Sequence, residues 1–120
     1  MKTTLFSLLF IGFLFSSCNG QTEKKYESIA PIAFADKINT TPNAQIIDVR
    51  SPEEYTGQHI DNAVNINWNG EDFEGEVSKY DKSKPVFVYC MSGGRSKKAA
   101  EKLQELGFKT IYELDGGIMK

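Results

Sequence analysis

The sequence predicts an α/β fold built on a parallel sheet, and three observations lead to this prediction. Short apolar segments alternate with helix-forming segments from residue 28 to residue 114. No hairpin turn joins one apolar segment to the next, so the intervening helices make the connections. The chain has 120 residues, of which 40% are hydrophobic and 25% charged, as expected for one small globular domain.

The net charge of −2, with no basic cluster, argues against a nucleic-acid partner.

Residues 1–17 predict a targeting signal that is not part of the fold. Lys2 gives a positive start, and residues 5–15 form an apolar run. This run is shorter than the roughly 20 residues that span a bilayer. Two serines before Cys18 are typical of a bacterial lipoprotein signal. We therefore expect an exported protein of the bacterial cell envelope, anchored to the membrane by lipid on Cys18 and facing the periplasm. An ordinary signal peptide and an uncleaved signal anchor are the alternatives.

Residues 18–27 are polar with mixed charges and predict a flexible tether. The domain is expected at residues 28–120. It should open with a short strand and then a helix from Pro31, because proline suits the first turn of a helix. Phe34 and Ile38 give this helix an apolar stripe for the core.

Residues 45–49 predict a buried strand that ends in polar residues, Asp48 and then Arg50. In open α/β sheets, ligands bind at the carboxyl ends of the strands. We expect Asp48 to accept hydrogen bonds that hold the neighbouring loops. We expect Arg50 to pair with a carboxylate such as Glu53 or Glu54, so that Asp48 and Arg50 support the site rather than contact substrate.

A short helix should follow, with Ser51 as its N-cap, Pro52 in its first turn and Gly57 at its end. His59 is the only histidine in the chain. No spacing of histidine, cysteine and carboxylates suggests a metal site, and a role as metal ligand or general base is the alternative to a structural role for His59.

The rest of the domain continues the alternation of strands and helices. The pattern predicts a strand at 63–66, a turn at 68–70, a weak acidic helix at 72–80, a central strand at 86–89 and a last strand at 109–114.

The most informative stretch begins where the central strand ends, at Cys90. Residues 91–94 include two glycines and predict a tight loop, and residues 96–106 are strong helix formers. Gly107 is placed to end this helix. A thiol is therefore expected on a loop that faces the N-terminus of a helix.

This position has a chemical consequence for the thiol. Unpaired helix N–H groups, and loop N–H groups turned inward at Gly93 and Gly94, would form an anion-binding concavity, and Arg95 adds a positive charge. Such surroundings lower the pKa of a cysteine from about 8.5 to roughly 3.5–7.5. Cys90 is thus a candidate nucleophile, and an exposed thiol of this kind would oxidise readily. The alternative is a buried core cysteine without a chemical role.

Four motifs resemble those of the rhodanese-like sulfurtransferase family. Cys90 to Arg95 matches the Cys-x-x-Gly-x-Arg active-site loop, and residues 46–55, 58–66 and 114–117 are similar to three further family segments in the same order. The resemblance implies an open parallel sheet flanked by helices on both faces, supporting roles for Asp48 and Arg50, and a structural His59. The tryptophan-containing closing segment of the family is missing after the last motif.

The resemblance also implies a reaction. The Cys90 thiolate would take sulfane sulfur from a small anion such as thiosulfate and hold it as a persulfide. A thiol or cyanide acceptor would then remove it, without a metal or organic cofactor. The anion and the persulfide would be held by the loop residues, namely Met91, Ser92, Gly93, Gly94, Arg95 and Ser96.

Two alternative functions stay open at this point. A cysteine-dependent phosphatase or arsenate reductase of related fold would place five residues between cysteine and arginine, whereas four lie between Cys90 and Arg95. A lipid-tethered redox or binding module that exchanges disulfides with a partner is the non-enzymatic alternative.

Overall fold

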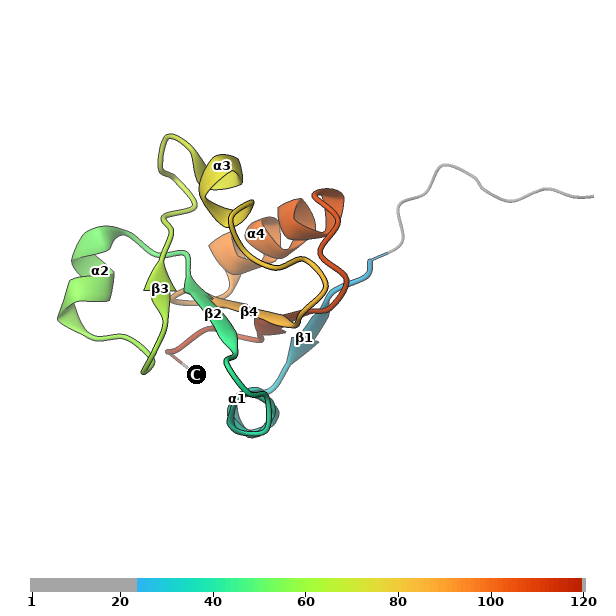
Figure 1. Cartoon of the computed structure of the whole chain (residues 1–120). Helices are drawn as coiled ribbons and strands as arrows, with labels where there is room; N and C mark the ends of the chain where they lie inside the picture. The colour runs from blue at the N-terminus through green and yellow to red at the C-terminus, as the bar shows by residue number, and fades with distance from the viewer. Residues whose placement is uncertain (1–23, 120) are drawn as a thin grey trace, which may run out of the picture.

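The computed structural model describes residues 24–119 and contains one sheet of five parallel strands with helices on both faces (Figure 1). The predicted parallel α/β architecture is confirmed. The predicted signal, Cys18 and most of the predicted tether lie outside the described residues. In chain order the elements are β1 (Glu27–Ile29), α1 (Pro31–Asn39), β2 (Gln45–Asp48), α2 (Pro52–Gly57), β3 (Val64–Asn65), α3 (Phe73–Val77), β4 (Val86–Tyr89), α4 (Gly94–Glu105) and β5 (Ile111–Leu114).

The strand order β1-β5-β4-β2-β3 places β4 at the centre of the sheet. β4 pairs with β2 on one side, with Val88 opposite Ile47, and with β5 on the other. All four residues of β4 are buried, which explains their apolar, β-branched and aromatic character. Because the strands are parallel, their carboxyl ends share one edge of the sheet, and Cys90 follows β4 at the middle of that edge.

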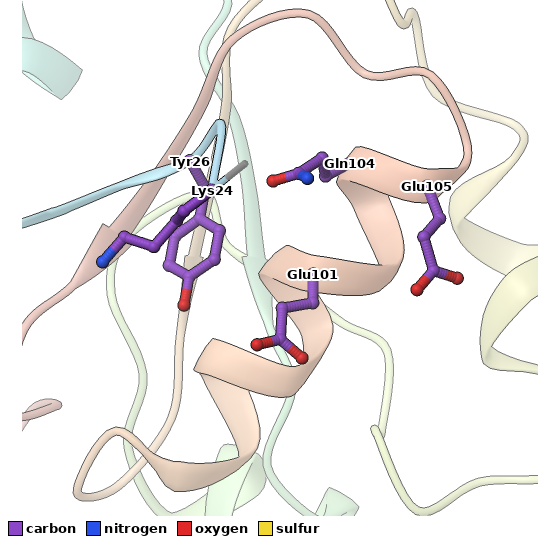
Figure 2. Close-up of a pocket in the computed structure, with 5 residues that line it drawn as sticks. All are labelled: Lys24, Tyr26, Glu101, Gln104 and Glu105. Carbon is purple, nitrogen blue, oxygen red and sulfur yellow. The ribbon is translucent and has the colours of Figure 1, made fainter. Parts of the chain in front are cut away.

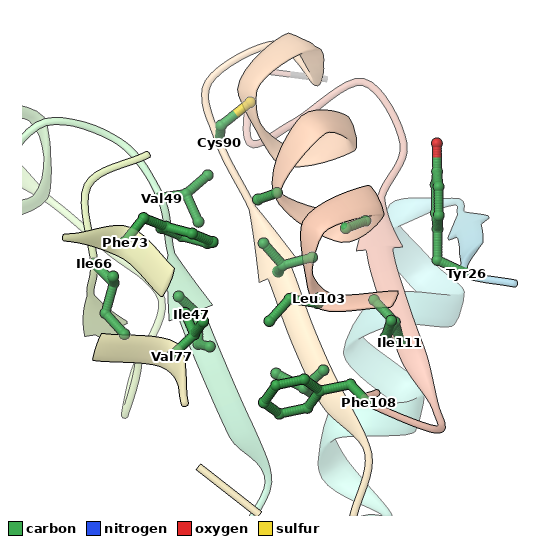
Figure 3. Packing of buried hydrophobic residues seen from close by; sticks show 14 residues of the cluster. Tyr26, Ile47, Val49, Ile66, Phe73, Val77, Cys90, Leu103, Phe108 and Ile111 are labelled. Atoms are coloured by element: carbon green, nitrogen blue, oxygen red, sulfur yellow. The ribbon is translucent and has the colours of Figure 1, made fainter. Parts of the chain in front are cut away.

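The helices divide the core into two layers. On one face, α3 and α4 cover a cluster that includes Val88 and Leu103 and extends to Cys90, whose sulfur points toward the start of α4 (Figure 3). On the other face, Phe34 of α1 and Tyr55 of α2 pack with Tyr89. Tyr89 and Cys90 are neighbours in the chain that serve opposite faces of the sheet.

The helix α2 begins as predicted. Its N-cap Ser51 forms a capping box with Glu54, in which each side chain bonds the other residue's backbone N–H. None of the helices within residues 24–119 is long and apolar enough to cross a membrane.

Several boundaries differ from the prediction. Tyr26 is buried and β1 starts at Glu27, so the predicted tether at 18–27 runs two residues too far. The helix α4 starts at Gly94, two residues before the predicted start, because Gly93 adopts φ +109° and completes the turn alone. Gly107 ends that helix with φ +99°, as predicted.

Candidate active site

The sulfur of Cys90 lies inside a ring of hydrogen-bond donors from its own loop. The backbone N–H of Gly93 donates to Sγ at 3.1 Å, and that of Ser96 donates at 3.3 Å. The hydroxyl of Ser96 lies 3.3 Å from the same sulfur. Amides aimed at one atom in this way stabilise a negative charge on it, so the predicted anion-binding loop is present and is closed around the sulfur itself.

The loop reaches this shape through its backbone. The N–H of Gly93 is directed at Cys90, and the positive φ of Gly93 lets α4 begin at the next residue. The chain end packs over the loop from the other side. The N–H of Ile118 donates to the carbonyl of Cys90 and that of Met119 to the carbonyl of Met91, each at 3.1 Å. These contacts hold the loop carbonyls away from the sulfur.

Two opposing effects set the pKa of the Cys90 thiol. Burial is the largest single effect and raises it, because a charged sulfur is poorly solvated at that depth. Hydrogen bonds from the Ser96 hydroxyl and from the N–H groups of Ser96, Gly93 and Ser92 lower it. Together the hydrogen bonds outweigh burial, so the pKa lies below that of a free cysteine.

The sulfur is far less accessible than predicted, because Cys90 is only 1% exposed. The loop folds over it from one side and the α4 face of the core covers it from the other. The expected exposed thiol is therefore wrong. Cys90 is thus buried in the core, as in the alternative of a core cysteine, but its sulfur also accepts two backbone N–H groups.

The charge of Arg95 is directed elsewhere. Its guanidinium donates to both carboxylate oxygens of Glu54, at 2.8 and 3.3 Å, and not to the sulfur of Cys90. The hydrogen bond that Arg95 donates to Glu54 is the main cause of the raised pKa of Arg95, and the charge of Cys90 contributes less than that of Glu54. Arg50 does pair with a carboxylate, as predicted, but this partner is Asp48 at 2.7 Å and not Glu53 or Glu54, because Arg95 binds Glu54.

A second buried network lies behind the loop, on the other face of the sheet. Asp48 accepts hydrogen bonds from the backbone N–H of Arg50, from its guanidinium, and from the hydroxyl of Tyr89 at 2.6 Å. The N–H of Ile60 donates to that hydroxyl at 3.1 Å, and Arg50 also donates to the carbonyl of Gln58. The network ties β2, β4 and the segment after α2 together, and neither Asp48 nor Arg50 contacts the sulfur.

His59 lies at the end of the α2 region. Its ring stacks on that of Tyr55 with centroids 3.8 Å apart, and its Nδ1 lies 2.9 Å from the Tyr55 carbonyl oxygen. Within residues 24–119, no three histidine, cysteine, aspartate or glutamate side chains gather closely enough to hold a metal ion.

The sequence analysis missed Glu113, a fully buried carboxylate in β5. It accepts hydrogen bonds from the hydroxyls of Ser96 and Ser28, each at 2.5 Å, and from Lys97 at 3.2 Å. One signal was available, because Glu113 stands two residues after Ile111 in a strand and must therefore share the face that Ile111 buries.

A cavity of about 330 Å³ lies on the surface between the start of β1 and α4 (Figure 2). Its lining residues are Lys24, Tyr26, Glu101, Gln104 and Glu105. At 1.5 Å per residue along the helix, Gln104 is roughly 12 Å from Ser96, so this cavity is separate from the Cys90 loop.

Comparison with known proteins points to one family. The family model described as Rhodanese-like domain matches residues 31–120. Thiosulfate sulfurtransferase GlpE of Shewanella oneidensis is 37% identical over 81 residues, which cover 68% of this chain and 78% of the relative. Thiosulfate sulfurtransferase GlpE of Coxiella burnetii is 42% identical over 72 residues, covering 60% and 65%. The crystal structure of a rhodanese-related protein from Thermoplasma volcanium is similar with a TM-score of 0.67 and 30% identity, covering 78% of this chain and 87% of that one.

Proposed function

Because the chain belongs to the rhodanese-like domain family, we propose that it is a sulfurtransferase that carries sulfane sulfur on Cys90. The proposed donor is a small anion such as thiosulfate, and the acceptor is a thiol or cyanide. One observation carries the proposal, namely that backbone N–H groups of Gly93 and Ser96 converge on Sγ and favour its ionised form. The thiosulfate sulfurtransferases among the relatives support the same reaction class.

The first step forms the persulfide. The Cys90 thiolate attacks the outer sulfur of thiosulfate, a sulfur–sulfur bond forms, and the bond to the sulfite sulfur breaks with its electron pair. Sulfite leaves with two negative charges, and the persulfide keeps the one negative charge that the thiolate brought. The N–H groups already directed at Sγ are the donors nearest to that charge.

The second step returns the enzyme to its starting state. An acceptor thiolate attacks the outer sulfur of the persulfide, and the Cys90 thiolate is the leaving group. Cyanide would leave as thiocyanate by the same displacement. A persulfide that exists free of both substrates requires ping-pong kinetics.

Access to the sulfur sets a condition on both steps. Cys90 is 1% exposed, whereas Ser92 and Gly94 on the covering loop are exposed. We expect the outer part of the loop, at Met91 and Ser92, to move aside during each exchange while the N–H groups of Gly93 and Ser96 stay directed at the sulfur. A loop that is exposed on its outer side and contacts the chain end through two hydrogen bonds is suited to such a movement.

The experiment that tests the proposal follows the sulfur on the protein. After incubation with thiosulfate, intact-mass measurement should show a gain of one sulfur atom, and peptide mapping should place it on Cys90. Cys90→Ser should lose both the added sulfur and sulfur transfer to cyanide while keeping the circular dichroism spectrum of the parent. Sulfur transfer by the folded serine variant would contradict the proposal.

The same preparation separates the alternatives. Turnover of an aryl phosphate would favour a phosphatase, and mixed disulfides without added sulfur would favour a redox module. Two features support sulfur transfer over phosphate chemistry. Only four residues separate Cys90 from Arg95, and the guanidinium that would bind a phosphate is held by Glu54.

We also propose that the protein is exported to the bacterial cell envelope and anchored there through lipid on Cys18. The support is in the sequence, where an apolar run at 5–15 precedes two serines and Cys18. Metabolic labelling with a radioactive fatty acid should mark the full chain and should fail for Cys18→Ala. Equal labelling of that variant would refute the anchor.

A further inference from the structure

The buried carboxylate of Glu113 lies one hydroxyl group away from the nucleophile. Its Oε2 accepts from the Ser96 hydroxyl at 2.5 Å, and the Ser96 oxygen lies 3.3 Å from Cys90 Sγ. Both Glu113 and Ser96 have no exposed surface. Burying an ionised carboxylate costs desolvation free energy unless the group is well paired, so its partners are informative.

The hydroxyl of Ser96 has one hydrogen and three neighbours that could accept it. The carboxylate of Glu113 is the closest at 2.5 Å, while the sulfur of Cys90 and the carbonyl of Gly93 both lie at 3.3 Å. With the hydrogen directed at Glu113, the lone pairs of Ser96 Oγ face Cys90 and accept the thiol proton. When Cys90 also ionises, a single hydrogen must serve two anions, and one of them loses its hydrogen bond.

We propose that Ser96 links Cys90 and Glu113 into a pair that shares one proton, with Glu113 as the positioning residue that receives the thiol proton. The Cys90 proton moves to Ser96 Oγ as the Ser96 hydrogen moves to Oε2 of Glu113. The pair carries one negative charge before and after this exchange. Afterwards Ser96 donates to the thiolate and the protonated Glu113 donates to Ser96, so every group is paired.

The other oxygen of Glu113 is bonded to different donors. Oε1 of Glu113 accepts from Ser28 and from Lys97, whose side chain is 41% exposed and also pairs with Asp115 at 3.6 Å. Two other titratable groups interact with these residues through their charges, since Tyr26 is affected by Glu113 and Lys97, and Arg95 is affected by Cys90. Ser28 and Lys97 therefore occupy Oε1, while Oε2 is left for Ser96.

For sulfur transfer, which rests on the proposed function, the shared proton has a clear use. A protonated Cys90 becomes a nucleophile without releasing its proton to solvent. The proton stays on Glu113 while the persulfide exists and returns when the acceptor frees the Cys90 sulfur. The closed loop around Cys90 makes such internal storage valuable, because little water reaches the sulfur.

The test measures the rate of Cys90 alkylation by iodoacetamide against pH, which needs no sulfur donor and so fails separately from the proposed function. Groups that interact by more than about one pK unit titrate as a pair in two steps. The parent protein should therefore show two ionisations in its rate profile. Glu113→Gln should show a single ionisation, with a midpoint at least about one pH unit below that of the parent's second ionisation. The reason is that a neutral amide does not compete as an anion for the Ser96 hydrogen.

Two further variants identify Ser96 as the link. Ser96→Ala should reduce the two ionisations of the parent to one. Glu113→Gln should then shift the Cys90 ionisation much less in the Ser96→Ala background than it does in the parent protein. The matched control Glu101→Gln removes an exposed carboxylate from α4 and should leave the profile unchanged. If Glu113→Gln fails to fold, Ser96→Ala alone decides.

A single ionisation in the parent that Glu113→Gln does not shift would overturn the proposal. Two ionisations that persist in Ser96→Ala would also overturn it. So would a Glu113→Gln shift of the same size in the parent and in Ser96→Ala, because Glu113 would then act through its charge alone.

Discussion

Replacing Gly93 with alanine tests how the loop backbone controls the thiol. Gly93 has φ +109° and ψ −15°, a conformation that residues with a Cβ rarely adopt, and its N–H donates to Cys90 Sγ at 3.1 Å. The nearest atoms to an added Cβ are the N of Gly116 and the Nζ of Lys97, both at 3.5 Å, which is ordinary contact. The perturbation therefore acts through the backbone angle and not through a clash.

The magnitude follows from two limiting responses. If the loop keeps its shape, the left-handed conformation costs about 1–2 kcal/mol of unfolding free energy. If φ relaxes to negative values, the N–H turns away and the thiolate loses a hydrogen bond to a charged group, worth about 1.5–3 kcal/mol. At 1.36 kcal/mol per unit, the second response raises the pKa of Cys90 by roughly one to two units.

The assay combines urea unfolding with the pH profile of Cys90 alkylation. Gly94→Ala is the matched control, because Gly94 begins α4, is not among the residues with positive φ, and has open space where its Cβ would lie. Alanine there should be neutral or stabilise by up to about 1 kcal/mol. The reasoning is refuted if Gly93→Ala matches the parent in both unfolding free energy and pH profile.

Two further variants test the networks around the loop. Arg95 and the Ser51 cap lower the pKa of Glu54 from 4.5 to about 2, so this contribution to stability is complete above pH 4.5 and is lost as pH falls toward 2. Glu54→Gln should lower the unfolding free energy at pH 7 by about 1 kcal/mol and should weaken its dependence on pH in that window. If urea titrations show the same pH dependence for variant and parent, the prediction is wrong. Tyr89→Phe removes the buried donor to Asp48 and should cost about 1.5–3 kcal/mol in the same titrations, whereas a loss below about 0.5 kcal/mol would show that the hydroxyl is not needed.

The position of Cys90 was predictable because each part of its surroundings is encoded locally. An apolar strand, a pair of glycines and a helix-forming segment follow one another in the chain, so the thiol had to meet a helix N-terminus. The start of α2 was predictable for the same reason, since Ser51 and Pro52 act within one turn of helix.

The charge pairing around the site was not predictable in this way. Arg95 and Glu54 are 41 residues apart, and only the order of strands in the sheet decides which arginine meets which carboxylate. The hydrogen bond from Tyr89 to Asp48 also spans 41 residues. The burial of the sulfur depends on the chain end, where Gly117 approaches the Met91 carbonyl too closely to allow a side chain. Such contacts arise from tertiary packing, which a linear pattern does not specify.

Adjacent placement of Tyr89 and Cys90 has a consequence for anyone who redesigns this domain. Tyr89 packs in the cluster on the α2 side of the sheet, and Cys90 packs in the cluster on the α4 side, so one peptide unit separates the two. A substitution that moves the backbone at Tyr89 therefore acts on the peptide unit that carries Cys90. Substitutions that look remote because they lie on the opposite layer should therefore be treated as neighbours of the chemistry.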